Sequence, residues 1–420
     1  MTSKTRVVVI GAGLAGVTLA RRLGELGIPA LVVGDEEHRP YNRVLLAEVL
    51  AGRYGPEVIA LPAPAGLLRG RVTGIDRAGR TVRCADGSVI AYDTLVLATG
   101  SNPVLPPLRG LFTPDRELPE GVYAFRTMDD CLGLSKAVRP GTRAVVVGGG
   151  LLGVSAARAL AVRGAQVVVA QQSERLMERH LDPAASALVR RHLEGLGVEV
   201  HTECRVRDVR CAGGAVRSVE LGDGYALGAD LVVLACGVRP RTGLARDAGL
   251  AVGKGVLVDD ELRTSDPHVR AVGDCAEHAG RVYGLAAPAL EQAGVLAGLL
   301  ARDEGAAEGG AEAAPAPRSY TGTRALTRLT LTGTGGPRGP FDLAAFGETD
   351  PRPGDDVVQL ADATRGTYRK VVVRDDRLVG GVLVGELGTV GALARAWEGA
   401  EPLPSDGGPL LHLLTHDGGS

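Results

Sequence analysis

Two glycine-rich stretches have the residue types and spacing that bind a dinucleotide. In the first, RVVVIGAGLAG, an apolar run is followed by Gly11, Gly13 and Gly16. The first glycine of such a loop permits a tight turn, the second lets a pyrophosphate approach the backbone, and the third lets helix and strand pack closely. The N–H groups of the following helix, from Leu14 and Ala15 onward, then face the phosphates. One such loop alone is a weak indication.

The second stretch, AVVVGGGLLG, repeats the whole pattern with Gly148, Gly150 and Gly153. Leu151 and Leu152 occupy the positions at which its helix begins. An apolar run before each loop is typical of a parallel strand buried on both faces. Two strand–loop–helix units predict two bound dinucleotides, and therefore a redox relay between them.

Polar residues follow the second strand of the first unit, predicted for residues 28–34. Asp35 and Glu36 stand where an acid accepts hydrogen bonds from an adenosine ribose. A solvated acidic turn is the alternative, and the choice between the two acids stays open. Arg43 can reach a diphosphate with its fork of donors, or it can be a surface cation.

Two further strand ends belong to the first unit. YDTLVLATGSNP predicts a buried strand ending in Ala98, Thr99 and Gly100, a small turn that permits close contact with the first dinucleotide or simply closes the strand. A later strand ends in Gly273 and Asp274. The Asp274 carboxylate is placed to accept from a sugar or ribitol hydroxyl, to cap the helix that follows, or both.

The second unit leaves the choice of coenzyme open. Its second strand, residues 165–170, is followed by Gln171 and Gln172, so no acid binds a ribose diol there and no arginine pairs with a 2′-phosphate. Arg175 comes later and can serve either purpose. Another buried strand, DLVVLACG, ends at Gly237.

Composition limits the class of partner. The chain has 420 residues, which predicts two or three domains. Its net charge of −2 and its 3% of aromatic residues argue against nucleic acid or anionic lipid as a partner. The start runs directly into the first strand, and no apolar run has the length of a membrane span. We therefore expect a cytoplasmic protein that binds neither nucleic acid nor membrane.

The cysteines do not indicate a metal or a redox disulfide. None of the six stands in a CxxC or CxxxxC spacing, which iron–sulfur clusters and redox disulfides use. His201, Cys204 and Cys211 lie in or beside a strand pattern and lack a fourth ligand, so we expect no zinc there.

The remaining patterns predict the elements around these residues. A short helical face is expected within 40–52, at Leu45, Leu46, Val49 and Leu50. Helices are expected at 126–138 and 286–300, the last with Pro288 in its first turn. A hairpin is expected at 72–89, a proline-rich crossover at 103–119, and a flexible insertion at 303–317. The segment after residue 320 predicts a third domain, with strands at 325–331, 341–346, 368–373 and 378–384 before a helix at 389–398.

Taken in order, GAGLAG, LVLATGSNP, GGGLLG, LVVLACGVRP and VRAVGDC resemble the FAD/NAD(P)-dependent pyridine nucleotide-disulfide oxidoreductase superfamily over nearly the whole chain. The resemblance implies an α/β fold with two Rossmann-like, three-layer ββα domains, the second inserted in the first, and a small α+β C-terminal domain. It implies an FAD domain at 1–116 and 255–318, an NAD(P)H domain at 117–254, and an interface domain at 319–420.

The resemblance also assigns the cofactors, FAD on the first loop and NADH or NADPH on the second, with Asp274 on the FAD ribitol. The predicted FAD-binding residues are Gly11, Gly13, Leu14, Ala15, Gly16, Asp35, Glu36, Arg43, Ala98, Thr99, Gly100, Gly273, Asp274 and Pro288. The predicted NAD(P)H-binding residues are Gly148, Gly150, Leu151, Leu152, Gly153, Gln171 and Gly237. No general acid or nucleophile is expected, because hydride passes directly to flavin N5.

Within the family, PYNRVLLAEVLAG, RLMERHLDP, GLAAPALEQAGVLA and YRKVVVRDDRLVGGVLVGE look most like the FAD–NADH module of assimilatory nitrite or nitrate reductase. Rubredoxin and ferredoxin reductases are similar more loosely. The resemblance implies electron transfer to an external protein, either a sirohaem or iron–sulfur nitrite or nitrate reductase, or a ferredoxin or rubredoxin, and it allows a homodimer. An alternative from another class is a flavin-binding partner protein without enzymatic activity.

Three departures from the family pattern qualify this interpretation. No cysteine lies at 43–50 or in the first helix, which removes the disulfide-reductase interpretation. The cysteine-rich iron–sulfur and sirohaem domains of larger relatives are absent from the sequence, so we expect a partner to reduce nitrite. Relatives often carry Lys where this sequence has Glu48, and Glu where it has Ser155. In those relatives the two side chains pair beside the flavin ring. We expect Glu48 and Ser155 to face each other as flavin-side modulators, or Glu48 to point to solvent.

Overall fold

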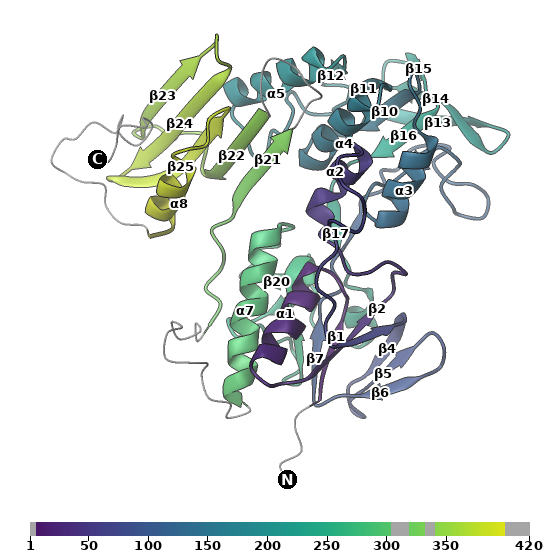
Figure 1. Cartoon of the computed structure of the whole chain (residues 1–420), viewed down its shortest axis with the longest axis vertical. Helices are drawn as coiled ribbons and strands as arrows, with labels where there is room; N and C mark the ends of the chain where they lie inside the picture. The colour runs from purple at the N-terminus through teal and green to yellow at the C-terminus, as the bar shows by residue number, and fades with distance from the viewer. Residues whose placement is uncertain (1–5, 304–318, 332–340, 400–420) are drawn as a thin grey trace. The chain divides into compact units, whose positions relative to one another are not determined.

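The computed structural model describes residues 6–303, 319–331 and 341–399, and the chain forms two compact units (Figure 1). The first unit comprises residues 1–46, 54–102 and 238–323, and the second comprises 47–53, 103–237 and 324–420. The expected insertion after Asp303 and the tail after residue 399 lie outside the described residues. The predicted domain boundaries stay a prediction.

A five-stranded parallel sheet forms the middle of the first unit, in the order β19-β7-β1-β2-β3. Its strands are β1 (Val7–Ile10), β2 (Ala30–Gly34), β3 (Gly66–Arg69), β7 (Thr94–Leu97) and β19 (Val269–Ala271). All four residues of β1 are buried. The apolar run before the first glycine loop is therefore an inner strand covered on both faces, as predicted.

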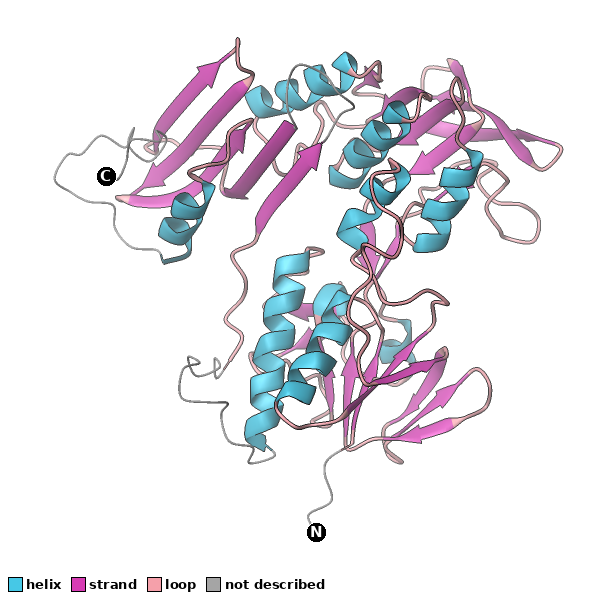
Figure 2. Ribbon diagram, in the orientation of Figure 1, coloured by secondary structure: helices cyan, strands magenta, loops and turns pink. Residues whose placement is uncertain are grey.

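Helices and a second sheet cover the two faces of this sheet (Figures 1 and 2). Helices α1 (Leu14–Glu25) and α7 (Ala286–Asp303) pack on one face in a cluster that includes Val9, Leu19 and Leu296. On the other face Val8 and Ile10 share a cluster with Val82 of the antiparallel sheet. The strands of that sheet are β4 (Val72–Asp76), β5 (Thr81–Cys84) and β6 (Val89–Ala91). The hairpin expected at 72–89 is part of it.

Shorter elements complete the first unit or lie at its boundaries, where residues 47–50 and Pro103 belong to the second unit. They are η1 (Arg43–Leu45), α2 (Leu46–Leu50), β8 (Ser101–Pro103), β17 (Val238–Pro240), α6 (Gly243–Asp247), β18 (Val256–Val258), η2 (Gly273–Cys275) and β20 (Ala276–His278). The buried strand expected to end in Ala98, Thr99 and Gly100 is β7, and the short strand β8 follows that turn. Strand β3 was not predicted.

The second unit repeats the three-layer arrangement around a parallel sheet of order β12-β11-β10-β16-β9. The strands are β9 (Val122–Tyr123), β10 (Arg143–Val147), β11 (Gln166–Ala170), β12 (Glu199–His201) and β16 (Leu231–Leu234). The helices are α3 (Met128–Ala137), α4 (Leu151–Val162) and α5 (Pro183–Gly195). An antiparallel sheet covers the other face through Val209, Val216 and Val219. Its strands are β13 (Val206–Ala212), β14 (Ala215–Leu221) and β15 (Ala226–Gly228).

The C-terminal part of the second unit is an antiparallel sheet with one helix. The strand order is β21-β22-β25-β24-β23. Its elements are β21 (Leu326–Leu331), β22 (Phe341–Gly347), β23 (Asp356–Asp362), β24 (Thr367–Arg374), β25 (Arg377–Val384) and α8 (Val390–Gly399). Leu393 and Trp397 of α8 pack on the sheet. The sequence predicted every element here except β23, an edge strand that buries none of its residues, although Val358 and Leu360 pack against the core while partly buried.

The third glycine of each loop is fixed by packing alone. A Cβ atom on Gly153 would lie 1.8 Å from the carbonyl oxygen of Gly148, and one on Gly16 would lie 2.0 Å from that of Gly11. We predict that Gly153→Ala lowers stability by about 2–3 kcal/mol, because backbone must move to admit the methyl group. The thermal unfolding midpoint of the purified protein measures this loss.

Gly195→Ala is the matched control, since a Cβ on Gly195 meets nothing within 4 Å at the end of α5. Its effect should be about zero to 1 kcal/mol in the stabilising direction. Equal midpoints for Gly153→Ala and wild type would contradict the packing account.

Candidate functional site

Predicted FAD-binding residues come together around the first glycine loop. Gly11 has φ +115°, and a Cβ atom there would lie 2.1 Å from the carbonyl oxygen of Ala98. Gly273 has φ +76°, and its Cβ would lie 2.9 Å from the Cβ of Ala15 and 3.8 Å from that of Ala289, one residue after Pro288. The loop, the turn after β7 and the turn after β19 therefore meet at the carboxyl ends of adjacent parallel strands, where open α/β sheets bind ligands.

Asp274 is held by a partner that the sequence did not indicate. The Ser101 hydroxyl donates to Asp274 Oδ2 at 2.7 Å. Asp274 lies inside the 3-10 turn η2, and strand β20 follows directly, so the alternative that it caps a following helix is wrong. Gln292, 1% exposed on α7, accepts the Gly273 N–H at 2.7 Å through its side-chain oxygen. A buried amide in an apolar helix was the available signal for Gln292.

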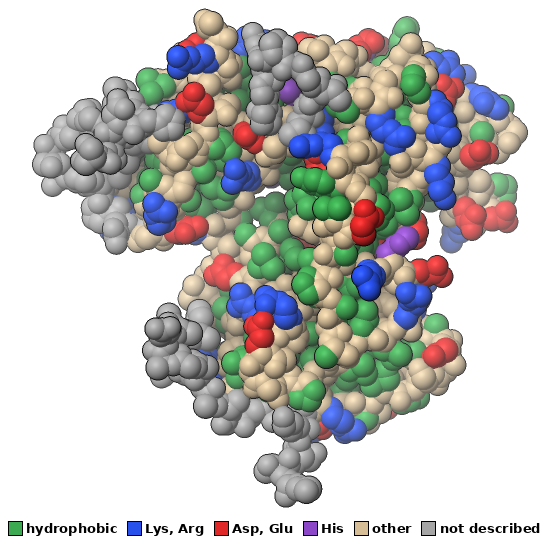
Figure 3. All heavy atoms as spheres, viewed as in Figure 1, with side chains coloured by type: hydrophobic (Ala, Val, Ile, Leu, Met, Phe, Trp, Pro, Cys, Tyr) green, Lys and Arg blue, Asp and Glu red, His purple; other side chains and the backbone are tan. Residues whose placement is uncertain are grey.

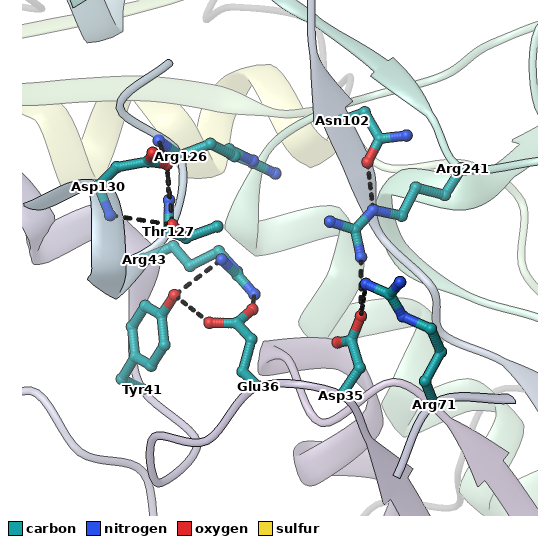
Figure 4. Close-up of polar contacts among 10 residues, drawn as sticks. All are labelled: Asp35, Glu36, Tyr41, Arg43, Arg71, Asn102, Arg126, Thr127, Asp130 and Arg241. Carbon is teal, nitrogen blue, oxygen red and sulfur yellow. Dashed lines mark hydrogen bonds and ion pairs between the residues drawn. The ribbon is translucent and has the colours of Figure 1, made fainter. Parts of the chain in front are cut away.

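The two acids after β2 have different surroundings (Figure 4). Glu36 accepts a hydrogen bond from the Tyr41 hydroxyl at 2.6 Å and forms an ion pair with Arg43. Burial lowers the pKa of Arg43, but Tyr41 and the Glu36 carboxylate outweigh burial and the pKa is raised overall. Asp35 is more exposed and lies 3.8 Å from Arg71 and 3.9 Å from Arg241.

The turn after β7 is also tied to the segment that carries Arg241. The Thr99 hydroxyl donates to the carbonyl oxygen of Arg241 at 2.9 Å, and the Arg241 guanidinium hydrogen-bonds Asn102 (Figure 4). Gly100 has φ +70°, which favours glycine at the end of this turn. These contacts fix the backbone beside the first loop.

The second loop repeats this construction. Gly148 has φ +108°, and a Cβ on it would lie 2.5 Å from the carbonyl oxygen of Ala235. The Gly149 N–H donates to the Gln171 side-chain oxygen at 2.7 Å, and the Gln171 amide donates to the Arg175 carbonyl at 3.2 Å. The Gln171 side chain therefore holds the backbone of the loop at Gly149. Strand β16 ends at Leu234, and Gly237, with φ +97°, lies between it and β17.

The end of the second strand of this unit carries polar side chains that are partly exposed or exposed. The Arg175 guanidinium, 23% exposed, lies 3.4 Å from Glu174, and Gln172 is exposed. Leu151 and Leu152 are half-buried in the first turn of α4. Among the described residues directly after β11, Gln171 and Gln172 supply neither an acid for a ribose diol nor an arginine for a 2′-phosphate.

The middle glycines show what these loops accommodate. Gly13 and Gly150 are the N-cap residues of α1 and α4, with φ −81° and −77°, a backbone conformation open to any residue. A Cβ atom at either position meets no protein atom within 4 Å. The protein itself therefore does not need glycine there. A pyrophosphate that approaches the free N–H groups of the helix start does need it, so both loops fit a dinucleotide.

Glu48 has a different partner from the one predicted. Its carboxylate forms an ion pair with Arg158 of α4, whose side chain is 0% exposed, and lies 3.3 Å from Arg53. The Ser155 hydroxyl donates to the Leu151 carbonyl at 2.8 Å, within its own helix. The alternative that Glu48 points to solvent is wrong, because its side chain is 13% exposed. The prediction that Glu48 and Ser155 face each other stays a prediction. Their effect on the flavin stays a prediction.

Comparison with known proteins decides the family. Residues 5–293 match the family model described as pyridine nucleotide-disulphide oxidoreductase. The chain belongs to this family. Residues 340–398 match the rubredoxin NAD+ reductase C-terminal domain. Members of the family use FAD and NAD(P)H, so the protein is an NAD(P)H-dependent flavoprotein oxidoreductase, and the cofactors predicted from the sequence are confirmed.

Relatives of the chain include a nitrite reductase large subunit and a nitrate reductase electron transfer subunit. The chain is 35% identical over 387 residues to the nitrite reductase [NAD(P)H] large subunit of Klebsiella oxytoca, covering 89% of this chain and 38% of that protein. It is 32% identical over 396 residues to the assimilatory nitrate reductase electron transfer subunit of Bacillus subtilis, covering 91% and 48%. The chain therefore spans less than half the length of these relatives.

Solved structures share the fold. The putidaredoxin reductase of a covalent complex with putidaredoxin has a TM-score of 0.82 and 25% identity, with 98% of this chain and 99% of that chain covered. The ferredoxin reductase of the CYP199A2 system from Rhodopseudomonas palustris has a TM-score of 0.75 and 28% identity, with 91% of each chain covered. The predicted fold class is confirmed.

Other observations bear on partners and metals. All six cysteines are free thiols. Among the described residues, no group of His, Cys, Asp and Glu side chains could hold a metal, and no helix combines the length and hydropathy of a membrane span. Figure 3 shows cationic and acidic side chains interspersed over the drawn face.

We predict that alanine at the middle glycines separates ligand binding from folding. Gly13→Ala should lower FAD affinity, and Gly150→Ala should raise the KM for NAD(P)H by about tenfold while FAD stays bound, because the methyl group occupies the space of a pyrophosphate. Flavin content and steady-state kinetics with ferricyanide measure the two effects.

The unfolding midpoints of the FAD-free forms serve as the control, and they should match wild type because no protein atom lies near either methyl group. Normal flavin content in Gly13→Ala together with an unchanged KM in Gly150→Ala would show that the space serves no ligand.

We also predict that Glu48→Gln destabilises the protein by about 3 kcal/mol, because it leaves the buried Arg158 cation without its counter-charge. Arg53→Gln, which removes the more exposed partner of Glu48, should cost at most about 1 kcal/mol. Urea unfolding followed by circular dichroism compares the two variants. Equal losses of stability in the two variants would mean that the buried Glu48–Arg158 pair contributes no more to stability than the exposed Glu48–Arg53 pair.

Proposed function

We propose that this protein transfers electrons from NAD(P)H through FAD to a separate iron–sulfur or haem protein, as the electron-transfer component of nitrate or nitrite assimilation. The observation that supports the proposal is the open space at Gly13 and Gly150, each at the start of a helix and each free of protein atoms. Two such sites in one chain suit two dinucleotides and a transfer between them.

Each site residue has a role in this proposal. The N–H groups at the start of α1 bind the FAD pyrophosphate, and Asp35 binds the adenosine ribose, since Glu36 is already engaged by Tyr41 and Arg43. Asp274, oriented by Ser101, binds the ribitol chain. Arg43 keeps the Glu36 side of this segment in place and is within reach of a diphosphate.

The N–H groups at the start of α4 bind the pyrophosphate of NAD(P)H, with Gly237 beside them. Bound FAD would supply the hydride acceptor and the release of electrons singly or in pairs, and the chain contributes binding and orientation. No side chain is required as an acid or a nucleophile in this proposal.

The nature of the acceptor rests on relatives. The nitrite and nitrate reductase proteins named above support a sirohaem or iron–sulfur enzyme of nitrogen assimilation as the partner. A second candidate is a ferredoxin or rubredoxin. The match of residues 340–398 to a rubredoxin NAD+ reductase domain and the putidaredoxin reductase structure favour it. A cytoplasmic location, a homodimer and the predicted domain boundaries are parts of the same proposal.

Anaerobic titration of the purified protein with NADH and with NADPH tests the first half of the proposal. We expect one equivalent of the preferred coenzyme to bleach the flavin absorbance, because hydride transfer to FAD is stoichiometric. A yellow protein that neither coenzyme bleaches would support the non-enzymatic alternative.

Turnover with candidate acceptors tests the second half. Electron delivery to a sirohaem nitrite reductase, a ferredoxin and a rubredoxin is compared at equal concentration, with ferricyanide as the positive control. The proposal expects the highest kcat/KM with the nitrogen-assimilation acceptor. A higher value with ferredoxin or rubredoxin would select the second candidate.

A further inference from the structure

Two stretches far apart in the sequence meet at one buried carboxylate in the second unit. Asp182, 2% exposed, precedes α5, and its Oδ2 accepts hydrogen bonds from the Tyr368 hydroxyl at 2.6 Å and from Lys370 Nζ at 3.0 Å. Tyr368 and Lys370 lie on strand β24 and are 2% and 7% exposed. We call Asp182, Tyr368 and Lys370 the Asp182 cluster.

The second oxygen of Asp182 is also in use. Asp182 Oδ1 accepts the backbone N–H of Ala185 at 2.9 Å and so caps α5. Burial raises the pKa of Asp182, but the hydrogen bonds from Tyr368, Ala185 and Lys370 outweigh it, and the pKa is lowered overall. Burial and the acceptor carboxylate raise the pKa of Tyr368. The cluster is an ionised acid with its donors in place, the arrangement in which a buried ion pair is tolerated.

Hydrogen bonds connect the cluster to the second glycine loop. The Ser186 N–H donates to the Asp182 carbonyl at 3.0 Å, and the Ser186 hydroxyl donates to the Leu176 carbonyl at 2.9 Å. The next residue, Met177, donates its N–H to the carbonyl oxygen of Gly149 at 2.8 Å. The Leu176 side chain lies against Gly149, since a Cβ there would be 2.4 Å from Leu176 Cδ2.

The backbone of this connection is strained where it contacts the loop. Met177 is 1% exposed and has φ +52°, a left-handed conformation that is unfavourable for a residue with a long side chain. Such a conformation persists where the surrounding structure determines it, and it is found at ligand-binding segments. Residues 176–181 therefore depend on fixed supports at both ends, the Gly149 contact on one side and the Asp182 cluster on the other.

We propose that Tyr368 and Lys370 act through Asp182 as positioning residues for NAD(P)H, because they hold the segment that sets the geometry of Gly149. The C-terminal sheet is then a structural support of the coenzyme loop in addition to any role toward an acceptor. The inference rests on the proposed binding of NAD(P)H at Gly148 to Gly153.

Reduction of the FAD-loaded protein by NADH or NADPH, whichever wild type prefers, tests the proposal under anaerobic conditions. The observed rate against coenzyme concentration gives an apparent Kd and a limiting rate separately. In Lys370→Met and Asp182→Asn we expect the apparent Kd to rise about fivefold or more, at the lower end of measured coupling between sites. The limiting rate and the FAD content should stay within about twofold of wild type, since neither residue touches the reacting groups.

Arg374→Gln is the matched control. Arg374 lies on the same strand β24 and pairs with Asp355 and Glu348 inside the C-terminal sheet. This variant loses ion pairs of that sheet but leaves the contacts of Asp182 in place. It therefore reports how a weakened sheet alone changes the apparent Kd for the coenzyme. Its apparent Kd should equal that of wild type. If Lys370→Met does not fold, Tyr368→Phe, which removes one hydroxyl, decides the question with a smaller rise in Kd.

The outcomes separate this inference from the proposed function. An unchanged Kd in the folded Asp182-cluster variants, or an equal rise in Arg374→Gln, overturns the positioning role while the proposed function stands. Wild-type flavin that neither coenzyme reduces overturns both. A raised Kd in the cluster variants alone supports the inference.

Discussion

Close backbone packing around two glycine loops is the constraint on which the rest of this structure depends. At Gly11 and Gly148, carbonyl oxygens of the adjacent strand segment come so close that a side chain is excluded, and the left-handed φ values point the same way. That packing leaves the start of the next helix uncovered. Space for a pyrophosphate is therefore a by-product of how each loop folds, at Gly13 in the first unit and at Gly150 in the second.

Side-chain amides hold a loop N–H group in both units, one of them buried (Gln292) and one partly buried (Gln171). Gln292 holds the N–H of Gly273 beside the first loop, and Gln171 holds the N–H of Gly149 in the second. Each amide oxygen accepts a hydrogen bond from a glycine N–H. A buried N–H group without an acceptor would cost about 1–3 kcal/mol of stability. The residue after such a parallel strand often contacts a ribose, but here the Gln171 side chain hydrogen-bonds the loop backbone at Gly149. This explains why the residue types at that strand end did not reveal the coenzyme.

Local sequence patterns predicted the fold well where apolar residues recur at a regular spacing or where the backbone requires glycine. The two glycine loops, the inner strands and the hairpin at 72–89 follow from short-range rules, and the order of motifs supplied the family. The edge strand β23 was not predicted, and its core-facing side chains, Val358 and Leu360, are only partly buried. Side-chain partners such as Ser101 for Asp274, or Arg158 for Glu48, depend on tertiary contacts, which one sequence does not contain.

The central claim is that both helix starts bind the pyrophosphate of a dinucleotide. A crystal structure of the protein grown with FAD and NAD+ tests this most directly. The account predicts one pyrophosphate within hydrogen-bond distance of the N–H groups that follow Gly13, and another at those that follow Gly150. A structure in which either nucleotide binds elsewhere, or in which one helix start holds only water at saturating nucleotide, would contradict it.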